Sequence, residues 1–259
     1  MEWREKIEKI AENGEDRMLL AKVADKLETA MSREIPAATW FLSLREQDMV
    51  RRLLGEREGL CWFGGYEGAE RKMACYLPEY LDESSLEGNI VCLRAEFYKD
   101  DSPSHRDFLG ALMGIGIKRE TVGDICVGQG SCDFFVTPEI APFVLQNLDS
   151  AGRTHLTLQE IPLSEARIPE PETVEIRDTV ASCRLDSVAA SGFRVSRGTA
   201  AAEIAGGRAA VNGLPCEKGD KVLSEGDTVT IRGRGKIRLK ALGGTTKKGR
   251  ISIVIEKFV

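Results

Sequence analysis

Residues 184–213 read RLDSVAASGFRVSRGTAAAEIAGGRAAVNG and decide how the last third of the chain folds. Apolar residues recur at helical spacing in two short runs, LDSVAA and TAAAEIA. The tight turn between the runs carries Arg194, Ser196 and Arg197, and Ser196 stands where it can cap the second helix. The segment therefore predicts two helices joined by a basic turn, followed by a strand that ends at Asn212.

Charge separates this part of the chain from the rest. Residues 184–259 contain 15 Lys and Arg against 7 Asp and Glu, a net charge of +8, in a chain whose total is −5. The other residues contain 21 basic against 34 acidic side chains, a net charge of −13. Neutralising phosphate is a common reason to concentrate positive charge, so the last third is expected to have a polyanionic partner. A basic surface that meets only solvent is the alternative.

The order of helix, basic turn, helix, strand and hairpin resembles the S-four RNA-binding domain, a module named after a small-subunit ribosomal protein. In that family, Arg and Ser side chains of the paired helices contact phosphates. The resemblance implies this role for Arg184, Arg194, Ser196 and Arg197. Further basic residues of the same region extend the predicted RNA-binding set: Arg208, Arg232, Arg234, Lys236, Lys247, Lys248 and Arg250.

The composition is that of an ordinary soluble protein. The chain has 259 residues, of which 42% are hydrophobic and 30% charged, enough for two or three domains. No apolar run approaches the roughly 20 residues that span a membrane, and the amino terminus is too charged for a signal peptide. We therefore expect a cytoplasmic protein without membrane contact.

The cysteines and histidines show no spacing that is typical of a disulfide framework or a zinc site. No nucleophile–base pair and no glycine-rich cofactor loop occurs in the required context. We expect no metal, no cofactor and no catalytic residue.

Periodicity divides the chain into four parts and predicts an α+β fold. Residues 1–58 read as a small helical region. Residues 59–163 begin with a predicted hairpin, formed by GLCWFGG and RKMACYL, and the segment after it follows the order strand, helix, strand, strand, helix, strand. That order is the split βαβ arrangement of ferredoxin-like and RNA-recognition-motif folds. Residues 164–183, with prolines among acidic side chains, read as a linker that leads into a strand, and residues 184–259 form the S-four-type domain.

The middle region contains SPSHRDFLGALMGIGIKRETVGDI at residues 102–125. Ser104 and Asp107 have the spacing of a capping box, which indicates a helix start. The basic residues of the stretch are candidates either for docking on the ribosome or for a purely structural role: His105, Arg106, Lys118 and Arg119.

This stretch resembles the signature of the YlmH family, bacterial proteins with a helical start, an RNA-recognition-like middle domain and a carboxy-terminal S-four domain. The resemblance covers essentially the whole chain. It implies an RNA-binding protein that acts on ribosomes, in rescue or quality control of stalled large subunits, and we expect the protein to be non-catalytic. The implied partners are structured rRNA or tRNA and the large ribosomal subunit, with no DNA, and we expect a monomer.

The middle region departs from a standard RNA-recognition motif. The strand at residues 132–137 lacks the basic and aromatic pattern on which such motifs stack bases. Residues 59–163 carry 8 basic against 16 acidic side chains, a net charge of −8. We therefore expect that the sheet of this region does not bind bare RNA.

Two other functions remain open. One is an RNA-modifying enzyme with an unrecognised site in residues 59–163. The run RLDSVAASG superficially resembles the pseudouridine-synthase element that carries an Asp nucleophile, but its spacing is one residue too long, and the 73 residues after Asp186 are too few for such a domain. The other is a protein-interaction adaptor linked to cell division, in which the acidic middle domain binds a basic partner.

Overall fold

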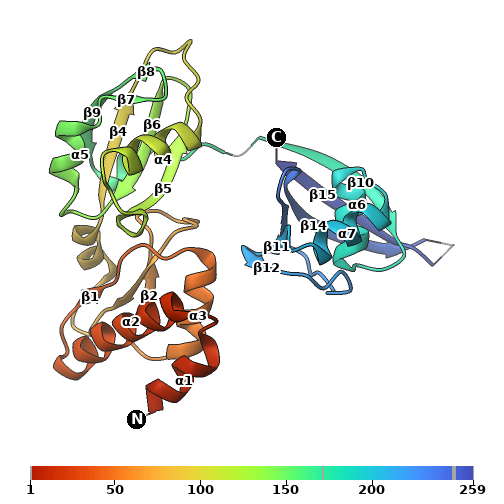
Figure 1. Ribbon diagram of the computed structural model, residues 1–259, viewed down its shortest axis with the longest axis horizontal. Coiled ribbons are helices and arrows are strands. Elements are labelled where there is room, and N and C mark those ends of the chain that lie inside the picture. The colour runs from red at the N-terminus through yellow and green to blue at the C-terminus, as the bar shows by residue number, and fades with distance from the viewer. Residues whose placement is uncertain (1, 171, 247–248, 259) are drawn as a thin grey trace. The chain divides into compact units, whose positions relative to one another are not determined.

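A computed structural model describes residues 2–170, 172–246 and 249–258. The chain divides into two compact units, Met1–Pro169 and Glu170–Val259 (Figure 1). Both units combine helices with antiparallel strands, so the predicted α+β class is confirmed. Among the described residues, no helix has both the length and the apolar character that crossing a bilayer requires.

The first part of unit 1 packs helices on one face of a small sheet with strand order β1-β3-β2. Leu20, Val23 and Leu27 lie on one face of α2 at helical spacing and share a core with Leu53 and Ala74. The elements are α1 (Glu2–Ile10), α2 (Gly14–Arg33), β1 (Ala37–Ala38), α3 (Leu44–Leu54), β2 (Leu60–Phe63) and β3 (Met73–Tyr76).

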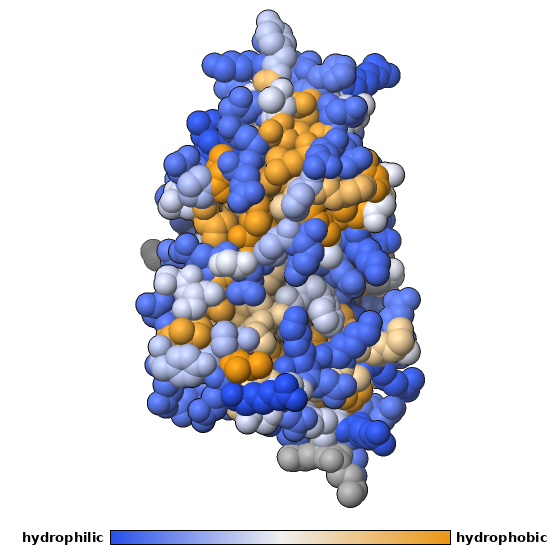
Figure 2. Space-filling view, turned by 90° about the vertical axis from the view of Figure 1, so that its left-hand side faces the viewer, coloured by the Kyte–Doolittle hydropathy of each residue, from blue (hydrophilic) through white to orange (hydrophobic). Residues whose placement is uncertain are grey.

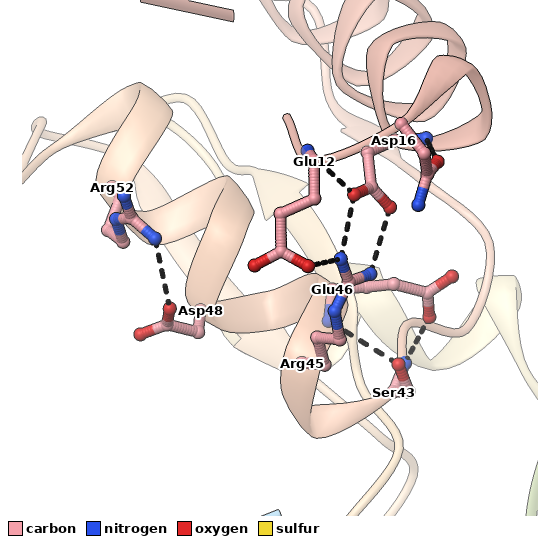
Figure 3. A network of polar contacts seen from close by, with 8 residues as sticks. Glu12, Asp16, Ser43, Arg45, Glu46, Asp48 and Arg52 are labelled. Carbon is pink, nitrogen blue, oxygen red and sulfur yellow. Dashed lines mark hydrogen bonds and ion pairs between the residues drawn. The ribbon is translucent and has the colours of Figure 1, made fainter. Parts of the chain in front are cut away.

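An ion-pair network joins the starts of α2 and α3 (Figure 3). The Arg45 guanidinium donates to the two carboxylate oxygens of Asp16 at 2.8 and 2.7 Å, and to Glu12 at 2.9 Å. Asp16 is buried, whereas Glu12 is exposed. Ser43 and Glu46 form a capping box at the start of α3, in the same helical turn as Arg45.

The second part of unit 1 is an antiparallel sheet with strand order β5-β6-β4-β9, covered on one face by α4 and α5. The predicted order of strands and helices is the one observed, and the sheet has the split βαβ topology. The elements are η1 (Glu83–Asn89), β4 (Val91–Glu96), α4 (His105–Gly114), η2 (Arg119–Thr121), β5 (Val122–Val127), β6 (Ser131–Val136), α5 (Ala141–Asn147), β7 (Ser150–Ala151), β8 (Thr154–His155), β9 (Thr157–Ile161) and η3 (Leu163–Glu165).

The two sheets of unit 1 pack face to face. Cys92 and Phe135, on the face opposite α4 and α5, share a buried core with Phe41 and Met73 from the first part. The ring of Tyr66 stacks on Phe135 with 5.1 Å between centroids. The part of the helix-free face around Cys92, Phe135 and Ile161 is therefore covered by protein, while Glu96 and Gln159 on the same face are exposed.

A buried ion pair fastens the end of unit 1 to this sheet. Arg94 on β4 donates to both carboxylate oxygens of Asp133 on β6, at 2.7 and 2.6 Å, and to the carbonyl of Glu165 at 2.8 Å. The amide of Arg167 donates to Asp133 at 2.6 Å. Charge pairing across two adjacent strands thus holds residues 165–167 in place.

Figure 2 shows unit 1 from its β9 side, where hydrophobic residues gather in the upper half of the face. This part of the surface lies over α5 and β9, the edge strand of the larger sheet. Phe143 of α5 is 46% exposed, and Leu158 of β9 is partly buried.

Unit 2 packs α6 and α7 on one face of a sheet with strand order β10-β15-β14-β13-β11-β12. Gly192 lets α6 lie close to the sheet, because a Cβ atom at this position would be 2.6 Å from Cδ1 of Ile237. The elements are β10 (Thr173–Val180), α6 (Leu185–Phe193), α7 (Arg197–Ala205), β11 (Ala209–Val211), β12 (Leu214–Pro215), β13 (Thr228–Ile231), β14 (Gly235–Thr245) and β15 (Ile251–Phe258).

The structure differs from the predicted division of the chain in two places. The predicted linker, residues 164–183, contains β10, which pairs with β15 over its whole length. The hairpin β2–β3, assigned to the middle region, pairs through β3 with β1 and packs on α2 and α3. Both differences are strand pairings between residues far apart in sequence, which local periodicity does not specify.

Candidate nucleic-acid interface

In the turn between α6 and α7, the backbone of Arg194 has a strained, left-handed conformation. The amides of Arg194 and Val195 donate to the carbonyls of Ser191 and Ala190, which is a Schellman motif. Arg194 has φ 54° and ψ 49°, a left-handed conformation in which glycine is the relaxed choice. Its side chain is exposed and makes no ion pair or hydrogen bond with the described residues.

Ser196 serves the fold of the turn. Its hydroxyl accepts a hydrogen bond from the amide of Thr199 at 3.0 Å and lies 2.8 Å from the Thr199 hydroxyl. The predicted N-cap of α7 is therefore confirmed. Ser196 is exposed and fixes the start of α7 next to Arg197.

A buried carboxylate gathers two of the predicted arginines. Arg197 donates through Nε and Nη2 to one oxygen of Asp186, at 3.0 and 2.9 Å, and Arg184 Nε lies 3.5 Å from the other. Asp186 is 6% exposed, while the side chains of Arg197 and Arg184 are 53% and 41% exposed. Asp186 thus fixes two exposed guanidinium groups near the start of the helix pair.

A second carboxylate, that of Glu203, binds two more of the predicted arginines. Arg234 donates through Nε and Nη2 to the two oxygens of Glu203 at 2.6 and 2.8 Å. Arg208 Nη1 lies 3.6 Å from Glu203, and Arg208 Nη2 donates to the carbonyl of Arg232 at 2.6 Å. The Arg234 side chain lowers the pKa of Glu203, which keeps this carboxylate charged. The side chain of Arg232 is exposed.

The other predicted contacts lie elsewhere. Arg250 donates to the hydroxyl of Thr179 at 2.9 Å and to its carbonyl, and it lines a groove of about 300 Å³ together with Arg197. Lys236 alternates with the core residue Ile237, so it lies on the sheet face opposite α6 and α7, 5.3 Å from the ring of Phe258. Lys247 and Lys248 lie outside the described residues.

In unit 1, the capping box of Ser104 and Asp107 is confirmed at the start of α4. The basic residues near it separate into two kinds. Arg119 donates to the carbonyls of Val122 and Gly123 at 2.6 and 3.2 Å, so it is part of the fold. Burial, followed by the positive charge of Arg71, lowers the pKa of Arg119 to about 10.

His105 is exposed at the start of α4, and partial desolvation together with the charge of Arg119 lowers the pKa of its imidazole. Arg106 and Lys118 are exposed. Arg106 lines a separate groove of about 460 Å³ between α4 and the segment before β7. Of the four candidate docking residues, three are thus exposed, and only Arg119 is held by backbone carbonyls of the fold.

The larger sheet of unit 1 does not present its aromatic residues for base stacking. Phe134 faces the core under α4 and α5, and Phe135 faces the smaller sheet. RNA-recognition motifs bind bases on exposed aromatic side chains of the sheet. The two phenylalanines of β6 are thus buried on opposite faces of the sheet, and neither is available for stacking on a base.

Sequence reasoning missed the two carboxylates that organise the basic groups of unit 2. Asp186 and Glu203 each bind an arginine that is distant in the sequence, and no local motif marks such a pair. Among the described residues, no group of three His, Cys, Asp or Glu side chains is arranged to hold a metal ion.

Comparison with known proteins matches an RNA-binding family model to the second part of unit 1 and not to unit 2. The family model described as "Putative RNA-binding domain in YlmH" matches residues 98–165. A Bacillus subtilis (strain 168) protein named "Ribosome-associated protein quality control protein P2" is 40% identical over 225 residues, which cover 85% of this chain and 86% of that protein.

A solved structure described as "Cell division protein ylmH from Streptococcus pneumoniae" is similar over 61% of this chain and 98% of that chain, with a TM-score of 0.49 and 20% sequence identity. The likeness to the Bacillus protein is much closer and runs through most of both sequences. With the matched family model, it shows that the chain belongs to the YlmH family.

Proposed function

We propose that this protein is a non-catalytic RNA-binding protein that recognises structured rRNA or tRNA on the ribosome through the turn between α6 and α7. The observation that carries the proposal is Arg194. This residue holds a left-handed conformation at some energetic cost, yet its side chain has no partner among the described residues. A strained, exposed and unpartnered arginine in a basic unit is well suited to contact a phosphate.

The surrounding charges support this role. Asp186 and Glu203 hold further arginines close to the helix pair, while residues 184–259 keep a net charge of +8. Pre-oriented guanidinium groups lose less side-chain entropy when they bind phosphate. Phosphate contacts would fix the position of the protein, and the shape of the RNA would supply most of the selectivity, as is usual for double-helical RNA.

The family gives the setting. The Bacillus relative is named for ribosome-associated quality control, and the family model matched in residues 98–165 of unit 1 is described as "Putative RNA-binding domain in YlmH". We extend this to the present chain as a cytoplasmic protein that acts on stalled large subunits. In unit 1 the exposed His105, Arg106 and Lys118 are the candidates for docking, since Arg119 serves the fold.

Two double variants test the interface. Arg194→Ala with Arg232→Ala removes two exposed charges near the helix pair, and Arg177→Ala with Arg238→Ala removes two from the opposite sheet face. Affinity for a structured rRNA hairpin, measured by fluorescence anisotropy, should fall on the order of tenfold for the first variant and little for the second. The log–log salt slope of the first should become shallower by about 1.5.

The same variants should differ in cosedimentation with isolated large subunits. Equal losses of hairpin affinity in both variants would show that binding follows total charge, and unchanged affinity in the first would remove the turn from the interface.

A further inference from the structure

A groove in the first part of unit 1 combines exposed arginines with an aromatic floor. It has a volume of about 510 Å³ and lies between the end of α3, the segment that follows and the hairpin β2–β3. Trp62 and Leu60 give it apolar surface. Three arginines stand around it: Arg51, Arg52 and Arg57.

Two of these arginines are held over indole rings. The Arg51 guanidinium carbon lies 4.3 Å from the ring centre of Trp62, and that of Arg57 lies 4.6 Å from Trp3. Arg57 is also fixed by a hydrogen bond of 3.1 Å from Nε to the carbonyl of Leu54. Stacking orients each planar group while leaving its outer face and edge accessible.

Few acidic side chains compensate the positive charge of these arginines. Within the described part of the chain, Arg51 and Arg57 make no ion pair with a carboxylate, and Arg51 donates only to the amide oxygen of Gln47, at 3.3 Å. Arg52 lies 3.8 Å from Asp48 on the same helix, in an exposed pair that contributes little energy (Figure 3). Glu56 is the one acidic residue that lines the groove among those described.

This local excess of positive charge contrasts with its surroundings. Residues 1–169 contain 20 basic and 30 acidic side chains, a net charge of −10. Because unit 1 is negatively charged as a whole, electrostatic attraction alone would bind a polyanion to it only weakly. A ligand of the groove therefore needs additional binding energy, which stacking on the aromatic floor can supply. An unpaired nucleotide has that chemistry, since its base stacks on aromatic or guanidinium planes and its phosphate pairs with arginine.

We propose that this groove binds one unpaired nucleotide of an RNA strand, with the base on the Arg51–Trp62 stack and the phosphate near Arg52 and Arg57. Its volume lies in the range of small-ligand sites, large enough for one nucleotide. The proposal rests on the RNA-binding function and adds to it a second contact, specific for single-stranded RNA.

The test uses the full chain and two probes, a single-stranded RNA decamer of mixed sequence and a structured rRNA hairpin with blunt ends and a compact tetraloop whose bases are paired or stacked on one another. Arg52→Ala with Arg57→Ala should weaken decamer binding about fivefold or more and leave hairpin binding nearly unchanged. Arg51→Lys keeps the positive charge but removes the planar guanidinium group on which the base would stack, so it should also weaken decamer binding. Arg33→Ala, an exposed charge at the end of α2, is the matched control and should have no effect.

Crosslinking adds a direct reading of the position. A decamer carrying 4-thiouridine should crosslink to the peptide that contains Trp62, and polyglutamate should compete poorly. Three outcomes would each overturn the proposal. The groove variants could bind the decamer as tightly as the wild type, the crosslinks could map to another part of the chain, or polyglutamate could compete as well as unlabelled decamer. Hairpin binding that depends on Arg194 would still support the proposed function, so the two ideas fail separately.

Discussion

At the scale of one residue, Arg194 combines a strained backbone with a side chain that we propose to bind RNA. Because its left-handed backbone suits glycine, Arg194→Gly should leave the free energy of unfolding unchanged or raise it by about 0.5–1 kcal/mol. The same substitution should lower affinity for the RNA hairpin as much as Arg194→Ala does. Urea unfolding and anisotropy measure the two effects, and wild-type RNA affinity in the glycine variant would contradict the role of the side chain.

Asp16 should make part of the stability dependent on pH. Hydrogen bonds from Arg45 hold the pKa of this buried carboxyl below its usual value, so the folded state binds its proton less readily than the unfolded state. The resulting stabilisation is present above the unfolded pKa of about 3.9 and is lost as the pH falls through the folded pKa.

Asp16→Asn should therefore cost about 1–3 kcal/mol at pH 7, and its difference from the wild type should shrink below about pH 4. Urea unfolding at several pH values checks this. Asp48→Asn, which alters the exposed pair with Arg52, is the control and should change little. A deficit for Asp16→Asn that stays constant down to pH 3 would argue against the ion pair as its cause.

At the scale of elements, the pair of Arg94 and Asp133 joins β4 and β6 to the end of unit 1. Arg94→Met would leave the Asp133 carboxylate buried without its charge partner, which should cost about 3–5 kcal/mol. The amide of Arg167, which donates to Asp133, should then exchange hydrogen faster. Arg94→Met combined with Asp133→Leu should recover part of the stability, and a loss below about 1 kcal/mol in the single variant would show that the pair is dispensable.

At the scale of the whole molecule, we expect that unit 2 needs β10 in order to fold stably by itself. This strand covers the edge of β15, and its Ile176 and Val180 pack on the core under α6. A fragment of residues 170–259 should unfold cooperatively and bind the RNA hairpin within a few-fold of the full chain. A fragment of residues 184–259 lacks β10 and should melt at a lower temperature and aggregate more readily, because β15 becomes an open edge. Equal melting temperatures would show that β10 is an accessory strand.

The sequence by itself determined the features that depend on neighbouring residues. Helical periodicity and capping residues located α4, α6 and α7, and the change to strand periodicity gave the order of the elements in residues 59–163. The concentration of basic residues after position 184 is also a property of the sequence alone. These signals act within a few residues, so a single sequence is enough to read them.

Only the tertiary structure decided the features that join distant residues. It paired β10 with β15, covered part of the helix-free face of the larger sheet, and bound Arg119 to backbone carbonyls instead of leaving it for docking. It also placed Asp186 and Glu203 beside their arginines and brought Arg51 onto Trp62. Strand pairing, burial and ion pairing depend on which surfaces meet after the chain has folded, and neither local spacing nor composition encodes that choice.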